Sequence, residues 1–202
     1  MSDPALDEKY WGGRRPRVES LTPNEDQRSA IETIQTLIGS FKFATTDSGG
    51  RLIGPFNALA LRPALGMAFI QWAASSERES LLPKVIRELV ILTVGTAWDS
   101  DYEIYAHIME ARSAGLSEKL INGIRRGSTK ELNREQLAAY TFTRELIHRH
   151  RVSDETYAAV LRAYGFYGVI DMVHLIGTYL TASALLNAFE VPAPPIPPAV
   201  AR

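Results

Sequence analysis

Glu103 and His107 are the two residues in this sequence best suited to proton-transfer chemistry. Residues four apart on a helix share one face, so these two side chains can meet. A carboxylate beside an imidazole selects the tautomer of the ring and raises its basicity, which is the usual arrangement for a histidine that transfers protons. Apolar and aromatic neighbours indicate that the helix is largely enclosed: Ile104, Tyr105, Ala106, Ile108 and Met109.

Two structural interpretations compete with a catalytic one for this pair. Ser100 and Glu103 have the spacing of a capping box, in which the glutamate folds back to the first amide of the helix and has only a structural role. A glutamate and a histidine at this spacing can also form an ordinary surface contact. Spacing alone therefore leaves the function of the pair open.

Glu88 is the second candidate, because it interrupts an otherwise apolar helix. A charge buried there is costly unless it is paired or functional. Lys84, Arg87 or another core arginine could pair with it, and the sequence favours such a structural ion pair. Three other histidines carry weaker signals. His174 is predicted to be a hydrogen-bonded core residue, and the remaining two are expected to interact with a helix C-terminus: His148 and His150.

The overall composition excludes several classes of function. The 202 residues carry a formal net charge of −1, so there is no basic field for nucleic acid. The absence of cysteine excludes disulfides, thiolate nucleophiles and cysteine-ligated metals. No metal-binding motif, phosphate-binding loop or nucleophile elbow occurs. We read no signal peptide and no apolar run of membrane-spanning length, so a soluble cytoplasmic protein is expected, with no membrane partner.

Apolar residues recur at helical spacing throughout, and strand-like alternation is missing, which predicts an all-α fold. Thr22 and Pro23 are expected to begin the first helix, as N-cap and first helical residue. Seven to nine helices are predicted, over about 22–41, 54–75 with an interruption at Pro63, 80–96, 100–114, 117–126, 133–150, 153–164 and 167–189. The helix over 80–96 is apolar nearly all round, which marks a buried central helix. We expect an N-terminal arm over 1–20, one domain over 21–191 and a Pro-rich tail over 192–202.

Several motifs of this chain resemble the carboxymuconolactone decarboxylase family, which includes the alkylhydroperoxidase D-like proteins. The resemblance covers about residues 50–192 and rests on the order and spacing of its motifs. These are Gly54-Pro-Phe-Asn57, Arg87-Glu88-Leu-Val-Ile-Leu, Ser100-Asp-Tyr-Glu103-Ile-Tyr-Ala-His107, Ala111-Arg-Ser-Ala-Gly-Leu-Ser117, Leu175-Ile-Gly-Thr-Tyr179 and Leu186-Asn-Ala-Phe-Glu-Val-Pro192. It implies an alkylhydroperoxidase D-like helical bundle, here with an N-terminal helical extension, that assembles as a homotrimer or hexamer.

The resemblance also assigns roles to individual residues. In the peroxidase branch, a glutamate and a CxxC-plus-histidine motif form a redox relay, whose positions fall here on Glu88, Ser100, Glu103 and His107. Serine and glutamate cannot cycle through a disulfide, so no thiol peroxidase activity is expected. In the decarboxylase branch, which needs no cofactor, His107 would be the acid, Glu103 its orienter and Glu88 a second relay member.

A cofactor-independent lyase acting on a small lactone or cyclic carboxylic acid is therefore the leading prediction. Arg87, Tyr102 and Ser100 are the expected substrate-binding residues. Two alternatives stay open at this point. One is another proton-transfer reaction on the same site, such as an isomerisation or a hydrolysis. The other is a non-catalytic oligomer that binds a ligand.

Overall fold

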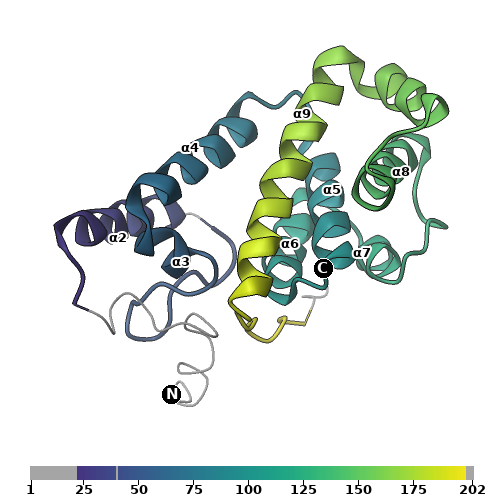
Figure 1. Ribbon diagram of the computed structural model, residues 1–202. Coiled ribbons are helices and arrows are strands. Elements are labelled where there is room, and N and C mark those ends of the chain that lie inside the picture. Colours follow the sequence, from purple (N-terminus) through teal and green to yellow (C-terminus); the bar gives the residue numbers. More distant parts are fainter. Residues whose placement is uncertain (1–21, 40, 199–202) are drawn as a thin grey trace.

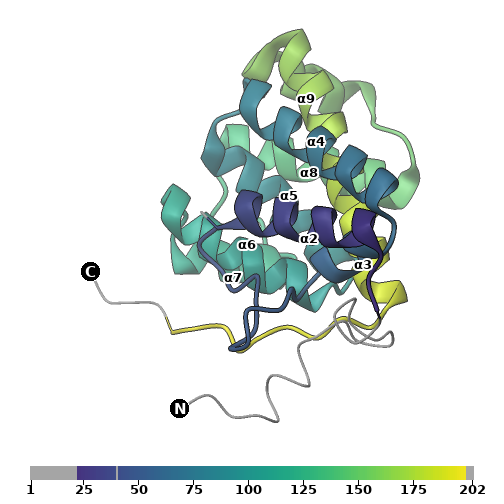
Figure 2. The same cartoon turned by 90° about the vertical axis from the view of Figure 1, so that its left-hand side faces the viewer.

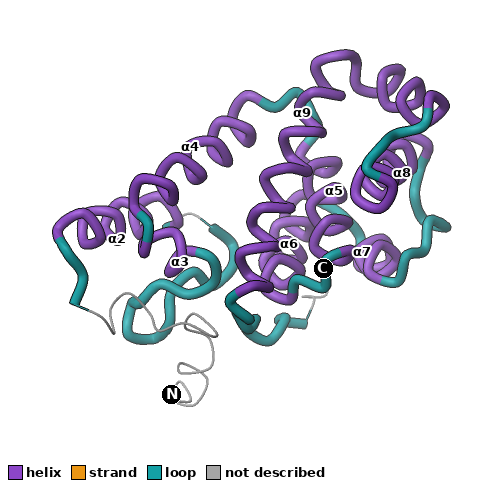
Figure 3. Tube along the Cα trace, viewed as in Figure 1, coloured by secondary structure: helices purple, strands orange, loops and turns teal. Residues whose placement is uncertain are grey.

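The computed structural model describes residues 22–39 and 41–198, and this part of the chain is helical, with no strand (Figures 1 and 3). Eight helices are labelled in it: α2 (Glu25–Ile38), α3 (Phe56–Leu61), α4 (Pro63–Glu79), α5 (Lys84–Ala97), α6 (Asp101–Ala114), α7 (Glu118–Arg125), α8 (Arg134–Arg149) and α9 (Asp154–Ala188). The predicted all-α class is therefore confirmed. The predicted N-terminal arm, residues 1–20, lies outside the described residues.

Helix α5 is the centre of the fold, as its all-round apolar sequence predicts. Every residue from Glu88 to Gly95 is buried, and α5 packs against α6, α7, α8 and α9. The main hydrophobic core surrounds it, with Leu89, Val90 and Leu92 fully enclosed. A helix in this position has no solvent-facing side, so any polar residue on it must find its partner inside the protein.

Helices α2, α3 and α4 form a layer on one side of this bundle, in front of α5 and α6 in Figure 2. They share a separate small core, which includes Ile34, Phe56 and Leu59. Helix α4 reaches the bundle by packing against α9. Between α2 and α3 the chain makes a turn closed by a single bridge between Thr46 and Leu52. This connection lies close to α6 and becomes part of the site described below.

Local capping chemistry explains several of the helix ends. Gly115 takes a left-handed conformation (φ 97°) directly after α6, as its position predicts. Ser117 accepts a hydrogen bond from the backbone of Leu120 and so caps α7. The prediction for α2 was wrong: the N-cap is Asn24, not Thr22. Asn24 and Gln27 form a reciprocal capping box, which satisfies two free amides at once.

Helix α9 contains a break that divides it into the two predicted helices. Gly165 has φ 71° and ψ 178°, a conformation outside the helical region that glycine tolerates best. Contrary to the sequence expectation, α9 is long and apolar enough to cross a membrane, by length and composition only, with a mean hydropathy of 1.5. Met172, Leu175 and Ile176 on this helix lie in the main core, as in the core helix of a globular bundle. After it, residues 192–198 of the Pro-rich tail have no regular structure.

Candidate active site

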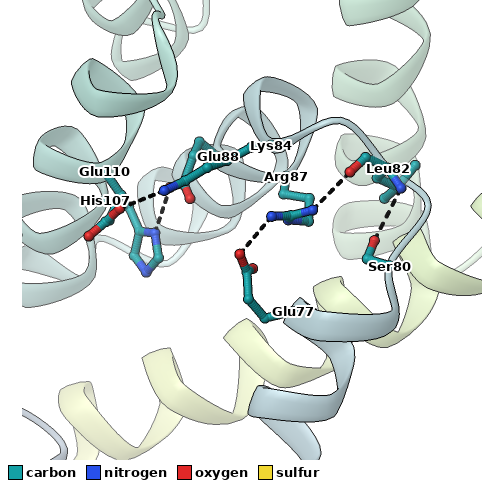
Figure 4. A network of polar contacts seen from close by, with 8 residues as sticks. All are labelled: Glu77, Ser80, Leu82, Lys84, Arg87, Glu88, His107 and Glu110. Carbon is teal, nitrogen blue, oxygen red and sulfur yellow. Dashed lines mark hydrogen bonds and ion pairs between the residues drawn. The ribbon is translucent and has the colours of Figure 1, made fainter. Parts of the chain in front are cut away.

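Glu88 and His107 meet inside the hairpin formed by α5 and α6. Their side chains approach to 2.8 Å between the glutamate Oε2 and the histidine Nδ1, a strong hydrogen bond (Figure 4). Only 3% of Glu88 and 7% of His107 is exposed. The expected pairing of Glu88 with Lys84 or Arg87 is not the one formed: within the described part of the chain, Glu88 forms its ion pair with His107. A carboxylate in this position holds the imidazole ring in one orientation.

Glu103 lies on the other side of the same imidazole. Its Oε2 is 3.6 Å from the histidine Nε2, which is within ion-pair range but beyond hydrogen-bond length. Glu103 is also buried, with 6% exposed. The sequence assigned the orienting role to Glu103, but the orienting hydrogen bond comes from Glu88. Because the distance from Nε2 to Glu103 is too long for a hydrogen bond, Nε2 is the ring nitrogen at which a small molecule could exchange a proton.

The structural alternatives for this pair are not realised. Ser100 is the N-cap residue of α6, yet in the described chain its side chain makes no capping hydrogen bond. His107 does not face solvent. A close approach of the two helices also keeps Glu103 inside: a Cβ placed on Gly95 would lie 3.3 Å from the Cβ of Glu103. Any larger residue at position 95 would push α6 and its carboxylate away from α5.

Burial and charge shift the proton affinities in this cluster. Burial raises the pKa of Glu103 above its usual value of 4.5; the His107 charge opposes this shift, and the Glu88 charge adds to it. For His107, burial lowers the pKa, but the charge and hydrogen bond of Glu88 outweigh burial, and the net result is a pKa above 6.5. Glu103 and His107 thus lie with Glu88 in one buried cluster, and both hold a proton more tightly than the free side chains do, as is common at functional sites.

Two aromatic rings enclose the imidazole. Tyr179 of α9 packs edge-on against His107, with ring centroids 4.8 Å apart, and Phe43 from the connection before α3 lies at 6.4 Å. Burial, followed by the charges of Glu103 and Glu88, raises the pKa of Tyr179 well above its usual value of 10. The sequence analysis quoted Tyr179 within a family motif but gave it no role. Its contact with His107 joins residues 72 positions apart, which helical spacing cannot reveal.

Tyr102 anchors the connection that carries Phe43. Its hydroxyl donates to the carbonyl of Ala44 at 2.6 Å, while the hydroxyl of Tyr105 accepts from the Ala44 amide at 3.1 Å. Gly54, with φ 67°, lies so close to the Tyr102 ring that an added Cβ would be 2.3 Å from it. The Tyr102 hydroxyl is therefore already engaged with the backbone of Ala44. A substrate bound by Tyr102, as predicted, would share the hydroxyl with this contact.

Arg87, another predicted substrate-binding residue, directly precedes Glu88 but makes its hydrogen bonds elsewhere, with residues outside the cluster. Its guanidinium donates to Glu77 Oε1 at 2.6 Å and to the carbonyl of Leu82 at 2.9 Å (Figure 4). Lys84 pairs with Glu110 at 3.0 Å in the same view. Ser100, the third predicted binding residue, is fully buried. Its hydroxyl finds no hydrogen-bond partner in the described part of the structure.

Other candidate features lie away from this cluster. His174 is exposed, so the prediction of a core histidine was wrong; its Nδ1 accepts from the indole of Trp72 at 3.3 Å. A surface groove of about 590 Å³ runs between α2 and the start of α4, near Asn24 and Arg62, and does not include the glutamates or His107. Over the described ranges, no group of three His, Cys, Asp or Glu side chains is arranged to hold a metal ion.

Comparison with known proteins identifies the fold through structure rather than sequence. No protein-family model and no curated protein matches the chain. A peroxidase-related protein with an alkylhydroperoxidase AhpD core from Ralstonia eutropha aligns with a TM-score of 0.70 and 20% identity, covering 91% of this chain and 93% of its own. A peroxidase-related protein from Silicibacter sp. aligns with a TM-score of 0.64 and 16% identity, covering 89% and 92%.

An enzyme also occurs among these structural neighbours. The debrominase Bmp8, solved in complex with 2,3,4-tribromopyrrole, aligns with a TM-score of 0.64 and 11% identity, covering 89% of each chain. At these identities the likeness concerns the fold. The chain therefore has an alkylhydroperoxidase AhpD-like helical fold, which is the fold that the sequence resemblance implied.

Proposed function

We propose that this protein is a cofactor-independent enzyme that transfers protons on a small lactone or cyclic carboxylic acid, with decarboxylation as the reaction. The observation that carries this proposal is the buried cluster of Glu88, His107 and Glu103. Burying two carboxylates and an imidazole costs several kcal/mol per charge before pairing repays it, on the order expected for ions removed from water. A cluster with this cost and with shifted pKa values is typical of a catalytic site.

The geometry suggests how the groups divide the work. Glu88 holds the ring through Nδ1, so Nε2 is the ring nitrogen that faces Glu103. In a decarboxylation, the bond to the leaving carboxylate breaks and its electron pair enters the adjoining unsaturated carbonyl system. CO₂ departs, and the carbon takes up one proton. In this proposal the imidazolium of His107 supplies that proton at Nε2, Glu103 returns a proton to the ring, and Glu103 regains its own proton from water when the product leaves.

The structural neighbours are compatible with a small cyclic substrate. One of them, the debrominase Bmp8, was solved with a brominated pyrrole, so this fold accommodates a small ring in that protein. Thiol peroxidase chemistry is not proposed, because the chain has no cysteine to form a disulfide. An isomerase or hydrolase using the same three groups, and a non-catalytic ligand-binding protein, are the alternatives against which the experiment below is designed.

We also propose a homotrimer or hexamer. Large apolar side chains stay exposed along α4, the turn after it and α9, as at a surface between copies of a chain; they are Leu65, Trp72, Leu81, Phe166, Tyr167, Ile170 and Val173. The mass of the particle in solution distinguishes these assemblies from a monomer. A cytoplasmic location and the lack of nucleic-acid or membrane partners stay predictions from the sequence.

The test is turnover of unsaturated γ-lactone acids of the muconolactone type, with CO₂ release and the mass of the product recorded. We expect His107→Asn to slow turnover by about 10²- to 10⁴-fold, the usual contribution of a general acid. His148→Asn is the matched control, because this histidine is exposed and lies in the last turn of α8, and it should keep the wild-type rate. A His107→Asn variant that is as fast as the control would refute the assignment.

A further inference from the structure

Ser183 on α9 is a buried polar residue that none of the preceding chemistry uses. It is fully buried, and its hydroxyl has no hydrogen-bond partner among residues 22–39 and 41–198. Ser100 shares both properties. An unsatisfied buried hydroxyl costs free energy comparable to a lost hydrogen bond, so each one calls for an explanation.

The contacts of α9 place Ser183 beside the catalytic cluster. Four residues before it, Tyr179 packs on His107. Four residues after it, Asn187 donates to the carbonyl of Trp98, just before α6, at 2.6 Å. Residues four apart lie on one helix face, so α9 runs antiparallel to α6 with Ser183 midway between these contacts. This position is level with Glu103, and within about one helical turn of Ser100.

A third contact supports this register. Leu186, three residues after Ser183, packs in one buried cluster with Tyr102 and Ala106 of α6. Ser183 therefore lies on the part of α9 that is covered by α6 and by the chain leading into it. The two serines come from different parts of the chain: Ser100 is the N-cap residue three positions before Glu103, and Ser183 lies on α9 at the level of Glu103.

We infer that the hydroxyls of Ser183 and Ser100 form a hydrogen-bonding subsite for an uncharged carbonyl oxygen of the substrate, such as a lactone carbonyl. This inference rests on the proposed function, because it places the substrate at the same cluster. Charge decides the chemical class. Two glutamates and one histidine occupy the neighbouring space, so a second carboxylate would be repelled there, whereas a neutral acceptor satisfies both hydroxyls.

The experiment compares two ligands that differ in the lactone group. The probe is 5-oxotetrahydrofuran-2-carboxylate, a saturated γ-lactone acid, and its reference is cyclopentanecarboxylate, which keeps the ring and the acid only. Dissociation constants are measured by NMR titration for the wild-type protein, Ser183→Ala, Ser100→Ala and Ser113→Ala. Ser113 is the matched control, an exposed serine on α6.

We expect Ser183→Ala and Ser100→Ala each to raise the dissociation constant of the lactone acid by about three- to tenfold, the range for losing one hydrogen bond. The dissociation constant of the reference ligand should stay unchanged. Neither variant should lower the melting temperature, because the hydroxyl removed has no protein partner. Equal effects on both ligands, no effect on either, or no binding of the lactone acid to the wild-type protein would overturn the inference. The turnover assay of His107→Asn is scored separately, so the proposed function can survive such an outcome.

Discussion

Helix α5 carries two groups of charged residues that differ in their surroundings (Figure 4). Glu88 faces inward to His107, where both partners are almost fully buried. Lys84 and Arg87 pair closer to the surface: each of their ion pairs has one partner that is about half exposed, Lys84 itself and Glu77 respectively. The outer pairs are screened by water and stabilise the fold little. The inner pair is shielded from water, so removing one of its partners should lower the unfolding free energy strongly.

The largest effect on stability is expected for Glu88→Ala. The variant leaves a buried imidazole with an unpaired nitrogen, and breaking a buried pair on one side costs about 3 kcal/mol of unfolding free energy. Glu88→Gln is the control of equal size, because its amide oxygen can still accept from Nδ1. Urea denaturation at 25 °C measures both. If alanine and glutamine cost the same small amount, the inner pair is no more important than the outer ones.

The inner cluster should also control how stability depends on pH. The pKa values of His107 and Glu103 are both raised on folding, from 6.5 and 4.5. The folded protein therefore holds these protons more tightly than the unfolded chain does. The stabilisation that these two protons contribute is complete below the unfolded-state pKa values. It is lost as the pH rises through the folded-state pKa values. We expect the unfolding free energy to fall above about pH 6.5.

A comparison with His107→Gln isolates this contribution, because that variant cannot titrate at position 107. Its unfolding free energy should change less between pH 6.5 and 9 than that of the wild-type protein. Parallel curves for the two proteins over this range would show that the inner cluster does not bind its proton more tightly on folding, and the contrast with the outer pairs would lose its electrostatic basis.

The smallest effect is expected in the outer group. Lys84→Ala removes an ion pair to Glu110 whose lysine side chain is 44% exposed, so the loss should be below about 1 kcal/mol and should shrink further in high salt. Thermal unfolding of the variant and the wild-type protein at low and high ionic strength measures this loss of stability. A loss as large as that of Glu88→Ala would remove the distinction between the two groups.

Much of this architecture could be predicted from local sequence. Helical spacing of apolar residues identified the helices, the all-round apolar pattern identified α5 as the central one, and Gly115 and Ser117 indicated where α6 ends and α7 begins. These features depend on contacts within a few residues, which a sequence displays directly. The same locality explains the error at Thr22, where a second acceptable cap, Asn24, stood two residues further along and also had Gln27 to complete its box.

The composition of the site was partly predictable, but its connections were not. Glu103 and His107 share a helix face, so their proximity follows from spacing alone. The partner that orients the ring is Glu88, nineteen residues earlier on another helix, and only the packing of α5 against α6 decides that it is closer than Glu103. Tyr179 and Ser183 come from α9, and Phe43 from a connection that Tyr102 holds in place. A sequence lists candidate acids and bases. The burial and the neighbouring charges that shift the pKa values of Glu103 and His107, and the distances that pair them with Glu88, exist only once helices from distant parts of the chain exclude water together.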